Sequence, residues 1–183
     1  MAVKLGKKEK HTIRSASRGL LVQLAAMPEH LKRADFRQQY AALCFRRVPD
    51  EDDIEILVIT SRETGRWIIP KGWPMKKKKP HEAAALEASQ EAGVRGRVGK
   101  RAVGRYTYLK WLDNQHVAPC IVEVFAIEVT EQKVDFKEQG QRKLAWVSPD
   151  EAARRVREVE LKSLLVHFRP TRKETSGSKS TKS

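Results

Sequence analysis

The stretch GWPMKKKKPHEAAALEASQEAGV, residues 72–94, decides how the rest of the chain is interpreted. It places four consecutive lysines, Lys76–Lys79, in front of an alanine-rich segment. Pro80 suits the first turn of a helix, and Gly93 suits a left-handed stop after its last turn. The stretch therefore predicts a basic loop followed by a helix over residues 80–92.

Two glutamates share one face of this predicted helix. Glu87 and Glu91 are four residues apart, and Gln90 lies beside them. Like charges at this spacing destabilise a helix by about 0.2–0.5 kcal/mol, and the helix dipole disfavours an anion near the C-terminal end. Neither glutamate has a Lys or Arg four positions away within the helix. The pair therefore indicates a cation supplied from elsewhere, with an ordinary solvated helix face as the alternative.

The flanking sequence predicts a mixed α/β fold. Apolar runs rich in β-branched residues indicate strands, and Ser148 opens a capping box with proline at the first helical position. That box predicts a second helix to about residue 158, with a further turn to residue 168 as the longer alternative. The acidic turn at residues 49–53 predicts a hairpin. The predicted strands are residues 40–48, 54–60, 67–69, 98–109, 119–129 and 144–147. Strands interleaved with helices in this way favour a mixed sheet sandwiched between helices.

The same stretch resembles the signature of the Nudix hydrolases. That signature reads Gly, five residues, Glu, seven residues, then Arg-Glu-apolar-x-Glu-Glu-x-Gly-apolar, and it aligns with this chain without a gap. Its first glycine falls on Gly72, its central glutamate on Glu87, its last glutamate on Glu91 and its closing pair on Gly93–Val94. Together with the order of segments from about Tyr40 to Phe168, this looks most like the branch of diphosphoinositol polyphosphate and dinucleoside polyphosphate hydrolases. The resemblance implies a Nudix-type α/β/α sandwich.

Three signature positions differ in this chain. Lys78 and Gln90 stand where the signature has glutamate, and Leu86 stands where it has arginine. The resemblance implies that the helix glutamates hold Mg²⁺ or Mn²⁺, which bridges the diphosphate of the substrate and helps to activate water. Fewer acidic groups weaken the binding of cations that prefer oxygen ligands. We therefore expect weaker metal loading, with the substrate diphosphate completing the coordination shell.

The resemblance also implies roles for individual residues. Glu91 is the first choice as metal ligand, Glu87 as ligand or activator of the water, and Gln90 as an auxiliary ligand through its carbonyl oxygen. Many relatives draw one further carboxylate from a loop outside the signature. Glu138 is the best-placed candidate for this role, and Asp135 competes with it. The alternative is that both merely solvate a loop.

Basic residues around the signature predict the substrate-binding wall. Lys76, Lys77, Lys78 and Lys79 precede the metal helix and are expected to overlook the same cleft, where ammonium groups can hold polyphosphate oxygens. Lys71 and Gly72 on the strand leading in, and Arg46 and Arg47 on a neighbouring strand, are expected to extend this wall. An exposed, solvated loop is the alternative for the lysine run.

The composition sets the limits for the whole chain. The net charge of +14 over 183 residues indicates an anionic partner. Residues 1–18 carry +5 of this charge and residues 170–183 carry +3. We expect a basic flexible tail over residues 1–17, one Nudix-like domain over residues 18–169 and a disordered basic tail over residues 170–183. A helix or irregular cap is expected within residues 18–34, and the first residues also permit organelle targeting.

The remaining features predict the cellular setting. Cys44 and Cys120 lie far apart in apolar runs, which favours two buried free thiols over a zinc site. No run of eighteen apolar residues occurs, so no membrane span is expected. A soluble, cytoplasmic protein is therefore predicted.

The hypothesis that these observations favour is a metal-dependent hydrolase that cleaves a phosphoanhydride bond in a highly anionic substrate. A Nudix-fold module that binds phosphorylated ligands without cleaving them is the first alternative, favoured by Lys78, Leu86 and Gln90. Nonspecific contact of the basic tails with nucleic acid is the second. The substrate, the choice of metal and the oligomeric state stay open at this stage.

Overall fold

The structure is a computed structural model that describes residues 36–49, 53–111 and 117–170. The predicted tail over residues 1–17, the helix or cap within residues 18–34 and the tail beyond residue 170 lie outside the described residues. No helix among the described residues is both long and apolar enough to cross a membrane.

Seven strands form one mixed sheet. The central order is β3-β2-β1-β6-β5, while β4 pairs with β1 and β7 pairs with β2. Strands β1 and β6 run parallel, and the other pairs are antiparallel. The strands are β1 (Arg37–Arg47), β2 (Ile54–Thr60), β3 (Trp67–Ile68), β4 (Lys71–Gly72), β5 (Val94–Trp111), β6 (Val117–Gln132) and β7 (Leu144–Val147).

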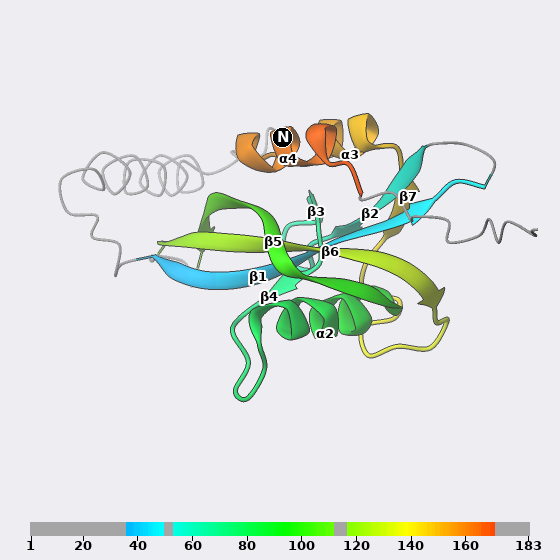
Figure 1. The fold of residues 1–183 in the computed structure, drawn as a ribbon. Coiled ribbons are helices and arrows are strands. Elements are labelled where there is room, and N and C mark those ends of the chain that lie inside the picture. Colours follow the sequence, from blue (N-terminus) through cyan, green and yellow to red (C-terminus); the bar gives the residue numbers. More distant parts are fainter. Residues whose placement is uncertain (1–35, 50–52, 112–116, 171–183) are drawn as a thin grey trace, which may run out of the picture.

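Helices cover both faces of this sheet. Helix α2 (Pro80–Ala92) packs on one face, and α3 (Pro149–Arg155) and α4 (Val159–His167) pack on the other (Figure 1). Each face has its own apolar core. Ala84, Ala88 and Ala92 of α2 pack on Leu57 and Ile127, whereas the opposite core contains Leu161 and Leu165 of α4. This arrangement confirms the predicted α/β/α sandwich with a mixed sheet.

The local predictions agree closely with the structure in the segment that carries the signature. Helix α2 has the predicted bounds, with Pro80 in its first turn and Gly93 in the left-handed conformation after its last residue. Strand β5 is longer than expected because it begins at Val94, directly after this stop.

The prediction of a single second helix is wrong in one respect, because this segment forms two helices, α3 and α4. Helix α3 ends at Arg155, and Val156 adopts an extended conformation that places its side chain in the core. Only half of the predicted capping box forms. The Ser148 hydroxyl accepts from the Glu151 N–H (3.3 Å), but the Glu151 carboxylate accepts instead from Arg154 and Arg155.

Gly93 is expected to be needed for stability as well as for ending α2. Its φ is +70°, and a Cβ there would lie 2.7 Å from the Lys133 carbonyl oxygen and 2.6 Å from the Phe136 ring. Gly93→Ala is expected to lower the free energy of unfolding by about 2 kcal/mol or more, since left-handed strain alone costs about 1–2 kcal/mol. Urea denaturation measures this change.

Gly65→Ala is the matched control. Gly65 also has a positive φ, +63°, but a Cβ there would meet nothing within 4 Å. It therefore isolates the cost of the backbone conformation. Equal losses of stability in the two variants would show that close packing around Gly93 contributes nothing.

Candidate functional site

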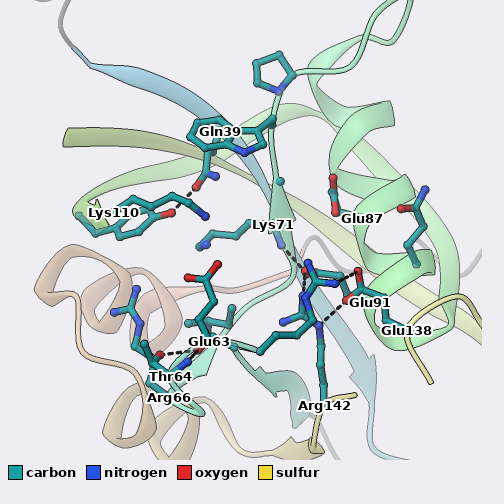
Figure 2. A pocket seen from close by; sticks show the side chains of 18 of the residues that line it. Gln39, Glu63, Thr64, Arg66, Lys71, Glu87, Glu91, Lys110, Glu138 and Arg142 are labelled. Atoms are coloured by element: carbon teal, nitrogen blue, oxygen red, sulfur yellow. Dashed lines mark hydrogen bonds and ion pairs between the residues drawn. The ribbon is translucent and has the colours of Figure 1, made fainter. Parts of the chain in front are cut away.

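A pocket with a volume of about 480 Å³ lies where α2, β4 and the end of β5 meet the segments that follow β2 and β6. The signature helix supplies one wall, with Glu87, Gln90 and Glu91. Glu138 joins them from the segment after β6, because the Glu138 N–H donates to the Gln90 carbonyl oxygen (3.0 Å) and ties that segment to α2. The pocket thus brings together the four residues that the sequence nominated for metal binding and catalysis (Figure 2).

Glu91 is the most buried of these acidic residues, with 5% of its surface exposed. Its carboxylate accepts a hydrogen bond from the Lys71 backbone N–H (3.0 Å). Burial raises the pKa of Glu91 to about 7, although Arg142 and the Lys71 N–H act in the opposite direction. Glu87 and Glu138 raise the pKa of Glu91 further, so these carboxylates lie close enough to disfavour each other's charge.

Glu87 lies partly exposed above Glu91 in the same pocket. Burial, and then the charge of Glu138, raise the pKa of Glu87 above its ordinary value. Gly72 makes room for this side chain, because a Cβ at Gly72 would lie 1.9 Å from Glu87 Oε1 and 2.2 Å from its Cδ. A larger residue on β4 would therefore displace the Glu87 carboxylate.

Arg142 lines the pocket, and the sequence analysis did not single it out. Its guanidinium pairs with the Glu91 carboxylate, lies 2.8 Å from Glu138 through Nε, and donates to the Thr60 carbonyl oxygen (2.9 Å). Its side chain is 5% exposed. Arg142 thus supplies the cation that α2 lacks. The spacing of four residues between Glu138 and Arg142 could have indicated their ion pair from sequence. The contact of Arg142 with Glu91 depends on tertiary structure and could not.

Of the two auxiliary candidates, Gln90 lines the pocket and Asp135 does not. Gln90 lines the pocket, but its side-chain oxygen accepts from Lys137 Nζ (3.2 Å). Asp135, the competitor of Glu138, is exposed and is not among the described residues that line the pocket.

Basic and aromatic side chains, together with Glu63, form the opposite wall (Figure 2). Lys71 Nζ lies 4.8 Å from the centre of the Tyr108 ring, and Arg66 lies 5.5 Å from the same ring. Lys110 Nζ lies 5.5 Å from the centre of the Trp73 ring at the mouth. Burial, and next the charge of Lys110, lower the pKa of Lys71 to about 8.

Two groups of residues that were predicted to bind substrate lie outside the described lining of the pocket. Lys76–Lys79 are exposed on the loop that projects beyond α2 (Figure 1), outside the described lining of the pocket. A tight turn between Met75 and Lys78, with Lys77 at a φ of +63°, directs this loop outward.

Arg46 and Arg47 lie at the other end of β1 from Gln39, the β1 residue that lines the pocket. Arg46 pairs there with Glu55, and Arg47 pairs with Glu128. The strand is too long for both of its ends to reach one site.

Comparison with known proteins gives the family. Over 119 residues the chain is 34% identical to diphosphoinositol polyphosphate phosphohydrolase 3-alpha from Mus musculus. The aligned region covers 64% of this chain and 67% of the mouse protein. The chain belongs to the Nudix hydrolase family. No protein-family profile matches it.

Solved structures agree with the Nudix fold. An Ap4A hydrolase from C. elegans superposes with a TM-score of 0.51 at 16% identity, over 72% of this chain and 94% of that one. The NUDIX domain of Shewanella oneidensis NrtR, solved with ADP ribose, gives a TM-score of 0.52 at 9% identity, over 78% and 94%. At these identities the likeness concerns the fold alone.

The oxygen donors of this Nudix pocket suit a hard divalent cation, since carboxylates are the ligands that Mg²⁺ and Mn²⁺ prefer. Among the described residues, however, no group of three or more His, Cys, Asp or Glu side chains is close enough together to hold a metal as it stands. Arg142 accounts for part of this spacing, because its guanidinium lies between Glu91 and Glu138. Lys78 does not affect the pocket charge directly, since it lies on the exposed loop.

Proposed function

We propose that this chain hydrolyses a phosphoanhydride bond in a phosphate-rich small molecule, with Mg²⁺ or Mn²⁺ as cofactor. The observation that supports this most strongly is the opposition of two walls in one pocket, with Glu87, Glu91 and Glu138 facing Lys71 and Lys110. A chain of phosphates needs cationic side chains to bind its oxygens and carboxylates to retain its metal. The similar mouse protein is named for a diphosphoinositol polyphosphate, which is a substrate of this chemical class.

In this proposal each wall has its own task. Glu91 and Glu138, with Glu87, would hold the divalent ion, which when bound would neutralise charge on the phosphates and lower the pKa of a bound water. Glu87 is partly exposed and has a raised pKa, so it is suited to accept the proton of the attacking water. Lys71, Arg66 and Lys110 hold phosphate oxygens and fix the position of the substrate.

The test is phosphate release from a panel of phosphoanhydrides, with Mg²⁺, with Mn²⁺ and after chelation. We expect release that needs the metal. The second candidate is binding without cleavage, which the ion pairs of Arg142 to Glu91 and Glu138 favour because they engage the carboxylates that would hold the metal. Calorimetric binding of a panel member without phosphate release under any metal condition would support that candidate and reject hydrolysis.

Gly72→Ala is expected to reduce this hydrolysis at least about tenfold while changing the melting temperature little. The added Cβ would collide with the Glu87 carboxylate, which is the end of a flexible side chain and can move away. Steady-state kinetics and thermal denaturation measure the two effects. The control is the double variant with Glu87→Ala, in which the collision is absent. If Gly72→Ala caused the same further loss in that background, the collision would not be its cause.

The basic wall is expected to affect KM, because its lysines are proposed to bind the substrate phosphates. Lys110→Ala is expected to raise KM about tenfold, because a charge-assisted contact to phosphate is worth about 1.5–3 kcal/mol. The control is Lys76→Ala with Lys78→Ala, which removes two charges from the exposed loop and is expected to change KM less. A larger effect from the loop variant would restore the lysine run to the binding site.

The proposal also concerns the predicted division of the chain into a domain and two tails. We place hydrolysis in the Nudix domain predicted over residues 18–169, and we assign none of the catalytic residues to the predicted tails.

A further inference from the structure

A second cavity, of about 700 Å³, lies at the other end of the strands from the catalytic pocket. We call it the β5 groove, and its cations are Arg47, Arg97, Lys100, Arg101 and Arg169. Gln39 lines the catalytic pocket and Arg47 lines the groove, so the two are eight residue steps apart along β1, or about 26 Å of strand. The groove therefore has no part in the proposed hydrolysis.

An irregularity in β5 creates the groove. Val98 pairs with Ile127 and Ala102 pairs with Phe125, so β5 contains two more residues than β6 between these pairs. The extra chain bulges out of the ladder and exposes Lys100 and Arg101. Beneath them lies an apolar floor that includes Phe45 and Phe168, whose rings pack edge to face with centres 5.2 Å apart.

Several of the groove cations are held in place by the protein. The Glu128 carboxylate accepts from Arg47 Nε (3.2 Å) and from Arg97 Nη2 (2.5 Å). Arg169 Nη1 donates to the carbonyl oxygens of Val166 (2.8 Å) and Phe168 (2.9 Å) at the end of α4. Groups fixed in this way lose less conformational entropy when they bind a ligand. Among the described residues that line the groove, Glu128 is the single carboxylate against five cations.

We propose that the β5 groove binds the sugar-phosphate backbone of nucleic acid without reading its sequence. The positive charge favours phosphates as partners. Phe45 and Phe168 are buried, with 5% and 8% of their surfaces exposed, and the described lining offers no other aromatic ring on which a base could stack. The described chain ends at Pro170, in the wall of the groove, and the thirteen residues after it carry four cations and one acid. The chain that follows the groove in sequence is thus also basic, which favours a long polyanion over a small phosphate as the partner.

The competing explanation is protection of a sheet edge. Strand β5 ends the order of the sheet, and lysines, arginines and bulges on edge strands prevent pairing with other chains. This explanation predicts self-association when the cations are replaced by apolar residues, and it predicts that charge reversal does not affect the binding of nucleic acid.

The experiment measures binding of the full chain to a fluorescent duplex oligonucleotide of mixed sequence, by anisotropy over a range of salt concentrations. Lys100→Glu with Arg101→Glu is expected to weaken binding at least about tenfold and to reduce the slope of log affinity against log salt by about two. Lys76→Glu with Lys78→Glu is the matched control, because it makes the same change of charge on the exposed loop beyond α2. We expect the control to change the affinity less than about twofold.

Three results would overturn the proposal. The groove variant could bind like the unchanged protein, the two variants could lose affinity equally, or inorganic polyphosphate could bind at the groove while a duplex of equal charge does not. Circular dichroism checks that the variants fold. Phosphate release by the groove variant is expected to match that of the unchanged protein, so failure here is distinct from failure of the proposed hydrolysis.

Discussion

Glu91→Gln is expected to reduce metal-dependent phosphate release at least about 100-fold while leaving the fold intact. Glu91 lies in the acidic wall, where its carboxylate pairs with Arg142 and would, in the proposed reaction, attract the divalent ion. Glutamine has almost the same shape, and its carbonyl oxygen can still accept the Lys71 N–H. The variant thus removes the charge and retains the packing. Steady-state kinetics with Mg²⁺ and Mn²⁺, together with circular dichroism, measure the two consequences.

Glu82→Gln is the matched control for this variant. Glu82 lies on the same helix but is exposed, and its carboxylate accepts the Lys79 N–H (2.9 Å) at the start of α2, a role that glutamine also performs. We expect it to keep nearly all activity. Full turnover of every substrate by Glu91→Gln would show that the site has been assigned to the wrong residues.

The sequence predicted the acidic wall because local rules govern it. A helix places residues four apart on one face, and Pro80 and Gly93 mark the ends of α2. The position of Glu87 and Glu91 relative to each other follows from these two facts alone. The strand that leads in, WI at residues 67–68, and the hairpin between β1 and β2 were also readable, since alternation and turn residues act over short distances.

The positive charges were harder to predict because tertiary structure decides where they point. Lys76–Lys79 are close to α2 in sequence, yet the turn at Lys77 directs them outward. Arg142 is 51 residues from Glu91 in sequence and reaches it only because the segment after β6 folds back on α2. Proximity in sequence therefore did not identify the cation that pairs with Glu91. The ion-pair partner of a helix glutamate can come from a distant loop, so it can be named only when the path of that loop is known.

Arg142→Gln is expected to lower the free energy of unfolding by about 3 kcal/mol in the absence of metal, because it leaves the buried Glu91 carboxylate without its counter-ion and removes one of the two cations beside the half-buried Glu138. The side chains of Arg142, Glu91 and Glu138 are 5%, 7% and 12% exposed, so water cannot replace the guanidinium well. Chemical denaturation of the metal-free protein measures this loss. Arg62→Gln is the matched control. Arg62 also approaches Glu138 (3.4 Å), but its side chain is 56% exposed, so the expected loss is below about 1 kcal/mol.

The same variant tests whether Arg142 and a divalent ion neutralise the same carboxylates. If they do, Mn²⁺ should raise the melting temperature of Arg142→Gln more than that of the unchanged protein, since a ligand at a given concentration stabilises the folded state more when it binds more tightly. The electrostatic reason is that Glu91 and Glu138 are then available to the ion without competition from the guanidinium. A smaller shift in the variant would mean that Arg142 positions the carboxylates for the ion instead of competing with it. Equal shifts would mean that the ion binds away from Glu91 and Glu138.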